Sequence, residues 1–196
     1  GDTEVILKGY RTLGTKIFDY LEGMYAIIIL DKIRNLAFAA RDPFGIKPLY
    51  MLKKGSFTGF ASEMRVFGRV RNSEPDLQAF SEFLTFKWAA GDVSNENGIK
   101  RVEPGYLYKI NLKNGQIRKK KFCEILDYLK NKNFFNIDTV NDAIVRSIKV
   151  HLQSDVGYSL QLSGGVDSSL ISAITSKNSL LSNKLVAYAV SFEDKK

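Results

Sequence analysis

The sequence has few of the residues that cross-link or interrupt a small fold. It contains one cysteine, Cys123, four prolines, one histidine and one tryptophan among 196 residues. A single cysteine excludes an internal disulfide framework and fits a reducing compartment. No apolar run approaches the roughly 20 residues that a membrane span needs; the longest, Met24 to Leu30, has the length of a strand. The sequence opens on Gly1-Asp2-Thr3-Glu4, without the basic and apolar regions of an export signal. We therefore expect a soluble, cytoplasmic protein and no membrane partner.

Positive charge is in excess, with a formal net charge of +8 and a pI near 9.4. The one dense basic run is Arg118 to Lys121, which follows the hairpin dipeptide Asn114-Gly115. Such a run is typical of an exposed strand edge protected by lysines, and a contact with a phosphate backbone is the alternative. We favour the strand edge and expect no nucleic-acid partner.

The first two thirds of the chain have the pattern of an antiparallel β-rich layer with helices against it. Apolar spacing from Thr3 to Leu21 is helical but includes Gly9 and Gly14, which predicts two short helices. Asp76 to Phe86 is predicted as an amphipathic helix with Asp76 as its N-cap. Extended segments are predicted at 25–31, 36–42, 49–53, 57–62, 106–112 and 116–122.

Beyond Phe122 the pattern changes. A polar stretch rich in Asn and Lys, residues 123–136, is interpreted as an interdomain linker. A helix capped by Asp138 is expected next, with its apolar face at Val140, Ala143, Ile144, Ile148 and Leu152. A strand at 156–162, a helix at 166–176 and a strand at 185–192 then form a βαβ unit with parallel strands. Two domains are therefore predicted.

The connection between strand and helix in this βαβ unit is Ser-Gly-Gly-Val-Asp-Ser-Ser, residues 163–169. Two glycines let the backbone approach a ligand, and serine hydroxyls lie beside the N–H groups and positive dipole of the first helical turn. The pattern predicts an anion site for a pyrophosphate, with Asp167 as a ligand for Mg²⁺. It lacks the lysine of a Walker A loop and the three glycines of a dinucleotide loop. An ordinary turn is the alternative for Ser-Gly-Gly alone.

This string resembles the PP-loop of ATP pyrophosphatases. Residues 151–156 (His-Leu-Gln-Ser-Asp-Val) and 162–174 resemble the opening of the synthetase domain of the asparagine synthetase family. Upstream, residues 21–26 (Leu-Glu-Gly-Met-Tyr-Ala), 41–50 (Arg-Asp-Pro-Phe-Gly-Ile-Lys-Pro-Leu-Tyr) and 61–63 (Ala-Ser-Glu) resemble the later half of a class II glutamine amidotransferase domain. Both resemblances in this order are more specific than either alone. One departure is Gly157, which stands where a proline is common.

The resemblance implies an α+β amidotransferase part of the N-terminal-nucleophile type, with αββα layers. The start of an α/β parallel-sheet PP-loop ATP pyrophosphatase domain follows it. The domains would be residues 1–122, a glutamine amidotransferase type 2 domain lacking its N-terminal part, a linker at 123–136, and 137–196. Family members begin with a nucleophilic cysteine, whereas this chain begins with Gly1, and further synthetase segments are expected beyond Lys196. We therefore expect no catalytic residue here and no activity from the separate chain.

The resemblance also implies binding residues. Asp2 would bind the α-amino group of glutamine, with a helix N-cap as the alternative role. Asp167 would bind the metal. The ATP site would comprise Leu162, Ser163, Gly164, Gly165, Asp167, Ser168, Ser169 and Val190.

The implied reaction makes asparagine from aspartate, glutamine and ATP through an aspartyl adenylate, with AMP and pyrophosphate released. Glutamine, aspartate and ATP would be the small-molecule substrates, ATP and Mg²⁺ the cofactors, and a homodimer the assembly of the longer enzyme. A related enzyme acting on a polysaccharide sugar acid, or closing a β-lactam ring, is the first alternative. A non-catalytic nucleotide-binding fragment is the second.

Two other patterns have a chemical and a structural interpretation. Arg41, Asp42 and Lys47 lie close together, but paired Arg and Asp beside prolines and a glycine more often fix a loop through a salt bridge. We favour that structural role. Cys123 with His151 suggests a catalytic pair, yet it lacks an orienting third group, and a buried small apolar side chain is the preferred interpretation of the cysteine.

Overall fold

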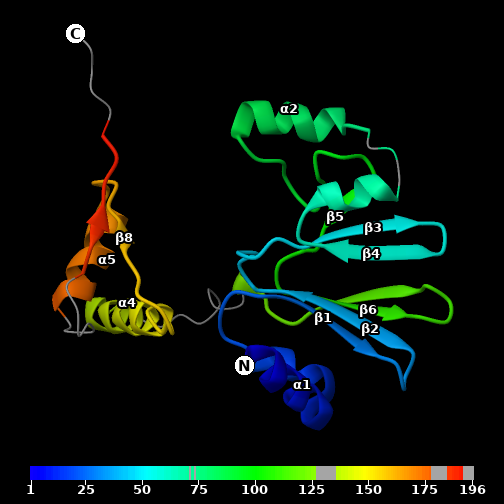
Figure 1. Ribbon diagram of the computed structural model, residues 1–196, viewed down its shortest axis with the longest axis horizontal. Helices are drawn as coiled ribbons and strands as arrows, with labels where there is room; N and C mark the ends of the chain where they lie inside the picture. Colours follow the sequence, from blue (N-terminus) through cyan, green and yellow to red (C-terminus); the bar gives the residue numbers. More distant parts are fainter. Residues whose placement is uncertain (71, 73, 127–135, 178–184, 192–196) are drawn as a thin grey trace. The chain divides into compact units, whose positions relative to one another are not determined.

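The computed structural model describes residues 1–70, 72, 74–126, 136–177 and 185–191. The chain divides into two compact units, residues 1–131 and 132–196 (Figure 1). The boundary falls within the segment interpreted as a linker, of which residues 127–135 lie outside the described part. No helix among the described residues is long and apolar enough to cross a membrane.

The first unit starts with the helix α1 (Asp2–Leu13) and the 3-10 helix η1 (Gly14–Asp19). The prediction of two short helices is confirmed, and the break lies at Gly14, while the helix continues through Gly9. Tyr10, Ile17 and Phe18 are the buried side chains of this pair. They supply the apolar surface that packs on a sheet.

That sheet has four antiparallel strands, in the order β1-β2-β6-β7. The strands are β1 (Ala26–Asp31), β2 (Leu36–Arg41), β6 (Tyr106–Asn111) and β7 (Ile117–Lys121), all predicted from the sequence within one residue at each end. The register pairs Ala26 with Arg41 and Ile110 with Ile117. The strands β1 and β7 are the edge strands, because they stand at the two ends of the order.

A second antiparallel sheet has the order β4-β3-β5. It comprises β3 (Tyr50–Lys54), β4 (Phe57–Ala61) and β5 (Ile99–Arg101), and the 3-10 helix η2 (Met64–Arg69) and the helix α2 (Leu77–Phe86) accompany it. Asp76 is the N-cap of α2, as predicted, because its Oδ1 accepts a hydrogen bond of 3.0 Å from the N–H of Ala79. The strand β5 and the helix η2 were not predicted.

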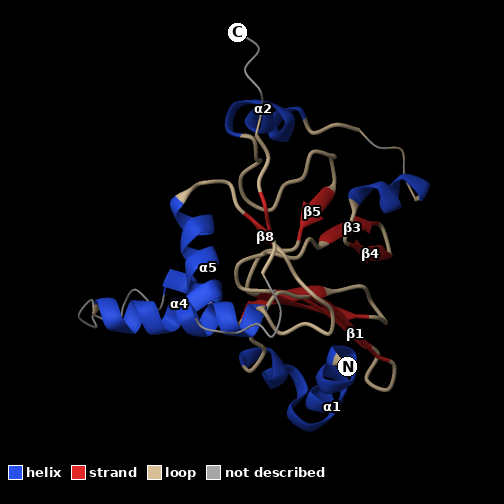
Figure 2. Cartoon of the chain, turned by 60° about the vertical axis from the view of Figure 1, so that its left-hand side comes forward, coloured by secondary structure: helices blue, strands red, loops and turns tan. Residues whose placement is uncertain are grey.

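Three apolar clusters show that these elements form layers. The α1–η1 pair packs on one face of the four-stranded sheet through Tyr10, Phe18 and Phe38. The opposite face packs on the three-stranded sheet through Leu49, Val102, Tyr108 and Ile110, with Met51 and Phe60. Phe67 of η2 packs with Leu52 and Ile99 on the far side of the second sheet. The first unit is thus an α+β fold with αββα layers, as expected (Figure 2).

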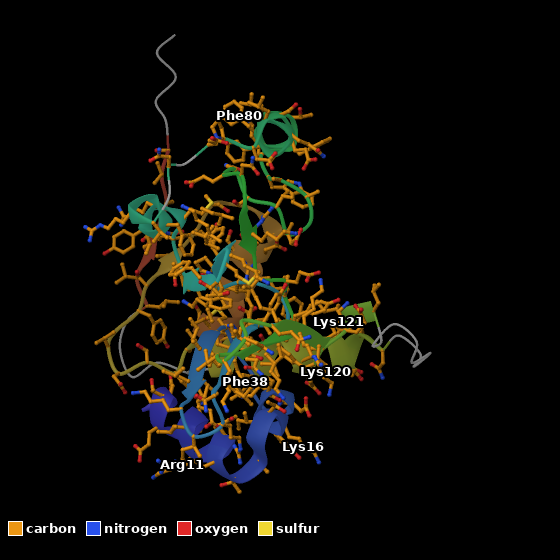
Figure 3. The ribbon with its side chains drawn as sticks, turned by 90° about the vertical axis from the view of Figure 1, so that its right-hand side faces the viewer. Arg11, Lys16, Phe38, Phe80, Lys120 and Lys121 are labelled. Atoms are coloured by element: carbon orange, nitrogen blue, oxygen red, sulfur yellow. The ribbon has the colours of Figure 1, made fainter. Side chains whose placement is uncertain are left out.

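The basic run lies on the edge strand β7, where Figure 3 labels Lys120 and Lys121. The Nζ of Lys119 lies 2.6 Å from the Oε2 of Glu103, and this hydrogen bond raises the pKa of Lys119. The Nζ atoms of Lys119 and Lys121 lie 5.4 Å and 5.3 Å from the ring centroid of Tyr106, a cation–π distance. Part of the run therefore has partners within the fold, which agrees with a protected edge.

The second unit contains α4 (Ile137–His151), β8 (Leu160–Gln161), α5 (Val166–Lys177) and β9 (Ala187–Tyr188). The strands β8 and β9 pair in parallel, as predicted, but each ladder segment has two residues where longer strands were expected. Residue 192, the predicted end of the last strand, lies outside the described part. The predicted cap of α4 is wrong by two residues, because the side chain of Asn136 accepts the N–H of Asp138 at 2.8 Å.

Candidate functional sites

The glycine-rich loop lies where its pattern predicted, between β8 and α5. The N–H of Leu162 donates to the carbonyl of Tyr188 at 2.8 Å, so the loop leaves the parallel pair at the carboxyl end of β8. Gly164 has a φ of 80°, a left-handed conformation that favours glycine. The helix α5 begins at Val166, two residues later. A strand, a tight turn and a helix N-terminus thus follow each other within seven residues.

Hydrogen bonds between serines give the loop its shape. The Oγ atoms of Ser163 and Ser168 lie 3.1 Å apart, and Ser168 Oγ also donates to the carbonyl of Gly165 at 3.1 Å. These bonds join the end of the strand to the first turn of α5. The N–H groups of that turn have no partner within the helix, and the helix dipole makes them attractive to an anion. The loop has the chemistry of a phosphate site, and its residues are accessible to solvent.

The other predicted ligands of this site lie around the loop. Asp167 is exposed in the first turn of α5, where the positive end of the helix dipole also favours its carboxylate. Val190 is 85% exposed, two residues beyond β9. Leu162 and Val190 follow parallel strands, so both lie at the carboxyl edge of the pair, where ligands of such sheets bind. The described residues include no cluster of three metal-ligating side chains.

A cavity of about 620 Å³ opens in the first unit beside Asp2. Gly1, and not Asp2, occupies the N-cap position of α1, and the Asp2 carboxylate has no hydrogen-bond or ion-pair partner among the described residues. The helix-cap alternative for Asp2 is therefore wrong. The walls are largely apolar and come from α1 and β1, with Met24, Tyr25 and Pro48. Such a volume is typical of sites for small molecules.

Three further polar side chains line this cavity, and the sequence analysis did not find them. They are Thr3, Lys47 and Ser62. Ser62 follows directly after β4 and Lys47 lies in the loop before β3, so only the folded sheets bring them beside α1. A carboxylate and an ammonium group on one apolar cavity suit a zwitterionic ligand.

The loop from Arg41 to Lys47 is fixed by side chains that bind backbone groups. Asp42 is fully buried, and its carboxylate accepts the N–H groups of Phe44, Ile46 and Lys47 at 3.0–3.1 Å. The guanidinium of Arg41 donates to the carbonyls of Lys47, Val102 and Gly45 at 2.8, 3.0 and 2.7 Å. The structural role is as expected, but the salt bridge between Arg41 and Asp42 is not among the ion pairs of the described residues.

Burial shifts the pKa of two groups at this loop. It lowers the pKa of Arg41, and the neighbouring Asp42 opposes that change. It raises the pKa of Tyr25 well above the usual range, and the negative charge of Asp42 adds to the effect. The hydroxyl of Tyr25 is buried without a hydrogen-bond partner among the described residues. Both groups keep their ordinary protonation state at neutral pH, which agrees with structural roles.

Cys123 and His151 each have neighbours within their own unit. Cys123 is half-buried and lines a second cavity of about 500 Å³, with Phe18, Phe44 and Phe122 among its neighbours. His151 is exposed at the end of α4, where its Nδ1 lies 2.8 Å from the carbonyl of Ser147. The two residues belong to different compact units. Aromatic surroundings suit Cys123 as a small apolar side chain.

Known proteins resemble both units. Residues 1–123 match a family described as a glutamine amidotransferase domain, and residues 139–196 match one described as asparagine synthase. Glutamine-hydrolyzing asparagine synthetase 1 of Bacillus subtilis (strain 168) is 33% identical over 193 residues, which cover 98% of this chain and 30% of the relative. Asparagine synthetase B of Escherichia coli (strain K12) is 34% identical over 178 residues, which cover 90% of this chain and 27% of the relative.

A solved structure, glutamine phosphoribosylpyrophosphate amidotransferase from B. subtilis, matches 91% of this chain and 35% of its own chain. Its TM-score of 0.39 and identity of 17% are too low to carry an argument. The chain spans about 30% of the length of the curated relatives it matches. The match to the glutamine amidotransferase domain family, over residues 1–123, includes the whole αββα fold and the cavity beside Asp2. The chain therefore belongs to the glutamine amidotransferase domain family, and its second unit carries the match to asparagine synthase.

Proposed function

We propose that the whole protein containing this chain makes asparagine from aspartate, with ammonia released from glutamine and with ATP as the activating substrate. The observation that carries the proposal is the order of the two sites. An amidotransferase unit with a cavity beside Asp2 comes first, and a strand-loop-helix phosphate site follows in the same chain. In this proposal residues 1–122 form the amidotransferase part, 123–136 the linker and 137–196 the start of the synthetase part.

In the first unit, Asp2 binds the α-amino group of glutamine. Its carboxylate is free of partners among the described residues and faces an apolar cavity, so an ammonium group can pair with it in partial shelter from water. We assign no catalytic residue to this chain. The Arg41–Lys47 loop supports the cavity wall because Lys47 and Pro48 line it.

In the second unit, the loop binds the phosphates of ATP through Ser163, Gly164, Gly165, Ser168 and Ser169. Leu162 and Val190 contact the nucleotide through their backbones. Asp167 would hold Mg²⁺, since this ion is commonly bound by one or two carboxylates together with substrate phosphates, and Asp167 is a single exposed carboxylate beside the loop. The ion would neutralise phosphate charge there.

The reaction itself needs activation, because a carboxylate is a poor electrophile. An oxygen of the aspartate side chain attacks the α-phosphorus of ATP, and pyrophosphate leaves from the loop. Ammonia then attacks the acyl carbon of the adenylate, the bond to AMP breaks, and the surplus proton passes to solvent. The role of the loop is to bind the leaving pyrophosphate with N–H and hydroxyl donors. We place this reaction in the cytoplasm and expect the whole protein to be a homodimer.

Product analysis with the whole protein tests the proposal. Aspartate, glutamine and ATP should give asparagine, glutamate, AMP and pyrophosphate in equal amounts. Formation of ADP and phosphate instead would exclude adenylation at this loop. Asp167→Asn should remove asparagine synthesis with either glutamine or ammonia as nitrogen donor, while Asp138→Asn, also in a first helical turn of the second unit, should retain it.

Asp2→Asn separates the two sites. Without its carboxylate, glutamine-dependent synthesis should fall roughly 10- to 100-fold, the value of a hydrogen bond to a charged group. Ammonia-dependent synthesis should not change, because the phosphate loop is intact. The matched control is Glu4→Gln, which alters an acidic residue in the same helical turn that pairs with Lys8 at 2.7 Å outside the cavity. Equal loss with both nitrogen donors would contradict the role of Asp2.

A further inference from the structure

A third cavity, of about 220 Å³, lies in the first unit at the end of α2. Its walls come from the last turn of α2 and the residues that follow it, from the loop before β5, and from β3, β5 and η2. The helix α2 lies at the end of the unit that is far from α1 (Figure 1). Among the lining residues are Tyr50, Phe83, Lys87, Trp88 and Arg101.

Both charged side chains of this wall are cations, Lys87 and Arg101, and neither has an ion-pair partner among the described residues. The guanidinium of Arg101 donates to the carbonyl of Val93 at 2.9 Å and to that of Ala89, which are neutral groups. Its charge also reaches the buried Arg41, whose pKa is lowered first by burial and further by Arg101. The described residues therefore leave positive charge on this wall unpaired.

Two acidic side chains near this wall have partners of their own. The carboxylate of Asp92 pairs with Lys100 at 3.0 Å. Glu82 accepts the N–H of Ala90 at 2.9 Å, and this bond is the main cause of the lowered pKa of Glu82, to which the charge of Arg101 contributes least. Neither carboxylate lines the cavity. An anion there would be attracted by two cations without a carboxylate on the wall to repel it.

Lys87 is held in a backbone conformation that favours glycine. Its φ is 64° at the C-cap of α2, where its N–H donates to the carbonyl of Phe83 at 2.8 Å. Asn35 is the other non-glycine residue with a positive φ among the described residues, and asparagine adopts this conformation more readily than lysine. Strained residues of this kind gather at ligand sites. The fold thus presents a lysine at this wall at the cost of backbone strain.

The size and the apolar part of the wall suit one aromatic ring. An apolar cavity of about 150 Å³ holds benzene, so the larger volume here has room for a ring with a carboxylate attached. The cavity is lined by Tyr50, Phe83 and Trp88, and aromatic rings pack favourably beside one another. Trp88 is 60% exposed, so a ligand would cover apolar surface that the fold leaves open.

We propose that this cavity binds a small aromatic monocarboxylate, whose ring packs beside Trp88 and whose carboxylate pairs with Lys87 and Arg101. Two cations on one wall suit a carboxylate, because its oxygens accept several charge-assisted hydrogen bonds at once. The site is independent of asparagine synthesis, since it shares no residue with the cavity beside Asp2 or with the loop at residues 163–169.

Equilibrium dialysis of benzoate against the whole protein tests the proposal. One benzoate should bind per chain with a Kd on the order of 1 mM, as expected of so small a ligand. Benzamide has the same shape without the charge and should bind at least about 10-fold more weakly. Acetate and phosphate should also compete at least about 10-fold more weakly, because they lack the ring. Equal binding of any of these three, or no saturable binding of benzoate, would overturn the proposal.

Lys87→Gln and Lys113→Gln form a matched pair of variants. Lys113 is exposed in the turn between β6 and β7 and does not line this cavity. Lys87→Gln should weaken benzoate binding about 10-fold, Lys87→Arg should retain it, and Lys113→Gln should leave it unchanged. Thermal unfolding verifies that the variants are folded. Equal losses in Lys87→Gln and Lys113→Gln would show attraction by net charge alone and would contradict the site.

The fluorescence of Trp88 locates the ligand. Trp88 is the one tryptophan of the 196-residue chain, so acrylamide quenching of that chain measures the exposure of this ring alone. Saturating benzoate should reduce the quenching about two-fold, because the bound ring covers part of the exposed indole. Benzoate that binds without protecting Trp88 occupies another place, and that result would also overturn the proposal.

Discussion

The two compact units of this chain differ in how their sheets are covered. In the first unit, the four-stranded sheet has helices on one face and the three-stranded sheet on the other, and three buried clusters fill the layers. In the second, the described residues include two buried side chains, Ile148 and Thr175, and the strand β9 is exposed. The first unit thus derives its stability from packing. The glycine-rich loop at residues 163–169 lies in the unit where packing contributes least.

The largest expected effect is the loss of Asp42. Asp42→Ala removes a buried carboxylate that accepts three backbone N–H groups and should destabilise the first unit by roughly 3–5 kcal/mol. Trp88 is the one tryptophan of the chain and lies in this unit, so its fluorescence during urea unfolding measures the change. Asp155→Ala, an exposed position in the second unit, should leave that transition unchanged. Equal transitions for both variants would contradict the role of Asp42.

Matched truncations in the two units should show the difference in packing. Leu52 of β3 is 1% exposed and packs with Phe67 of η2, so Leu52→Ala should cost about 2–5 kcal/mol through the cavity it leaves. Ile171 in α5 is 42% exposed, and Ile171→Ala should cost less than about 1 kcal/mol. Trp88 fluorescence measures the first change, and amide hydrogen exchange of α5 the second. A large loss of protection in α5 would show that the second unit has a core of its own.

The difference also explains which features the sequence predicted. The long strands of the first unit alternate clearly, and α2 carries its cap, so local pattern and tertiary packing agree at Asp76 and along β1 to β4. The place of the glycine-rich loop, between a strand and a helix, was predictable because its glycines, its serines and the start of α5 are consecutive in sequence. The three-residue strand β5 was not, because its pairing with β3 depends on residues nearly fifty positions away.

The Asp2 cavity shows the same limit at a site. Asp2 was proposed as a binding residue from a family resemblance, whereas Lys47 and Ser62 reach the cavity from other elements, and no local spacing relates them to Asp2. At the Arg41–Lys47 loop, the pattern predicted a fixed loop correctly and the interaction wrongly. The sequence shows that Arg41 and Asp42 are adjacent. It does not show that the hydrogen-bond partners of each side chain are backbone groups, because those contacts exist only in the folded loop.

Gly105 in the first unit and Gly164 in the second both have a left-handed backbone, so the cost of adding a methyl group can be compared at one position in each unit. Gly105 has a φ of 71°, and a Cβ there would lie 2.6 Å from the carbonyl oxygen of Cys123, so Gly105→Ala should cost about 2–3 kcal/mol. Gly164 has a φ of 80° but open space around it, and Gly164→Ala should cost about 1–2 kcal/mol, from backbone conformation alone. Unfolding of the first unit and ATP binding by the whole protein measure the two effects. Gly164→Ala should weaken ATP binding, whereas Gly105→Ala should not.

The smallest expected effect is a pH dependence at the surface of the first unit, where α1 meets the β1–β2 hairpin. Asp31 accepts the hydroxyl of Tyr10 at 2.8 Å and the N–H of Arg34 at 2.9 Å, and the bond from Arg34 contributes most to lowering the pKa of Asp31 below 3.8. A carboxylate with a lowered pKa in the folded state stabilises the fold at any pH above its unfolded value. That stabilisation is lost as the pH falls through the lower, folded value.

The free energy of unfolding in urea, monitored by Trp88 fluorescence, should therefore fall on acidification below about pH 4, and Asp31 is one contributor to that fall. Asp31→Asn removes the titrating group, so the acid limb of its stability profile should be shallower than that of the unsubstituted chain. Tyr10→Phe keeps the carboxylate and removes one of its hydrogen bonds. Its profile should lie between the other two, because the bonds from Arg34 still lower the pKa. Three superimposable profiles would show that the contact between α1 and the hairpin is energetically neutral.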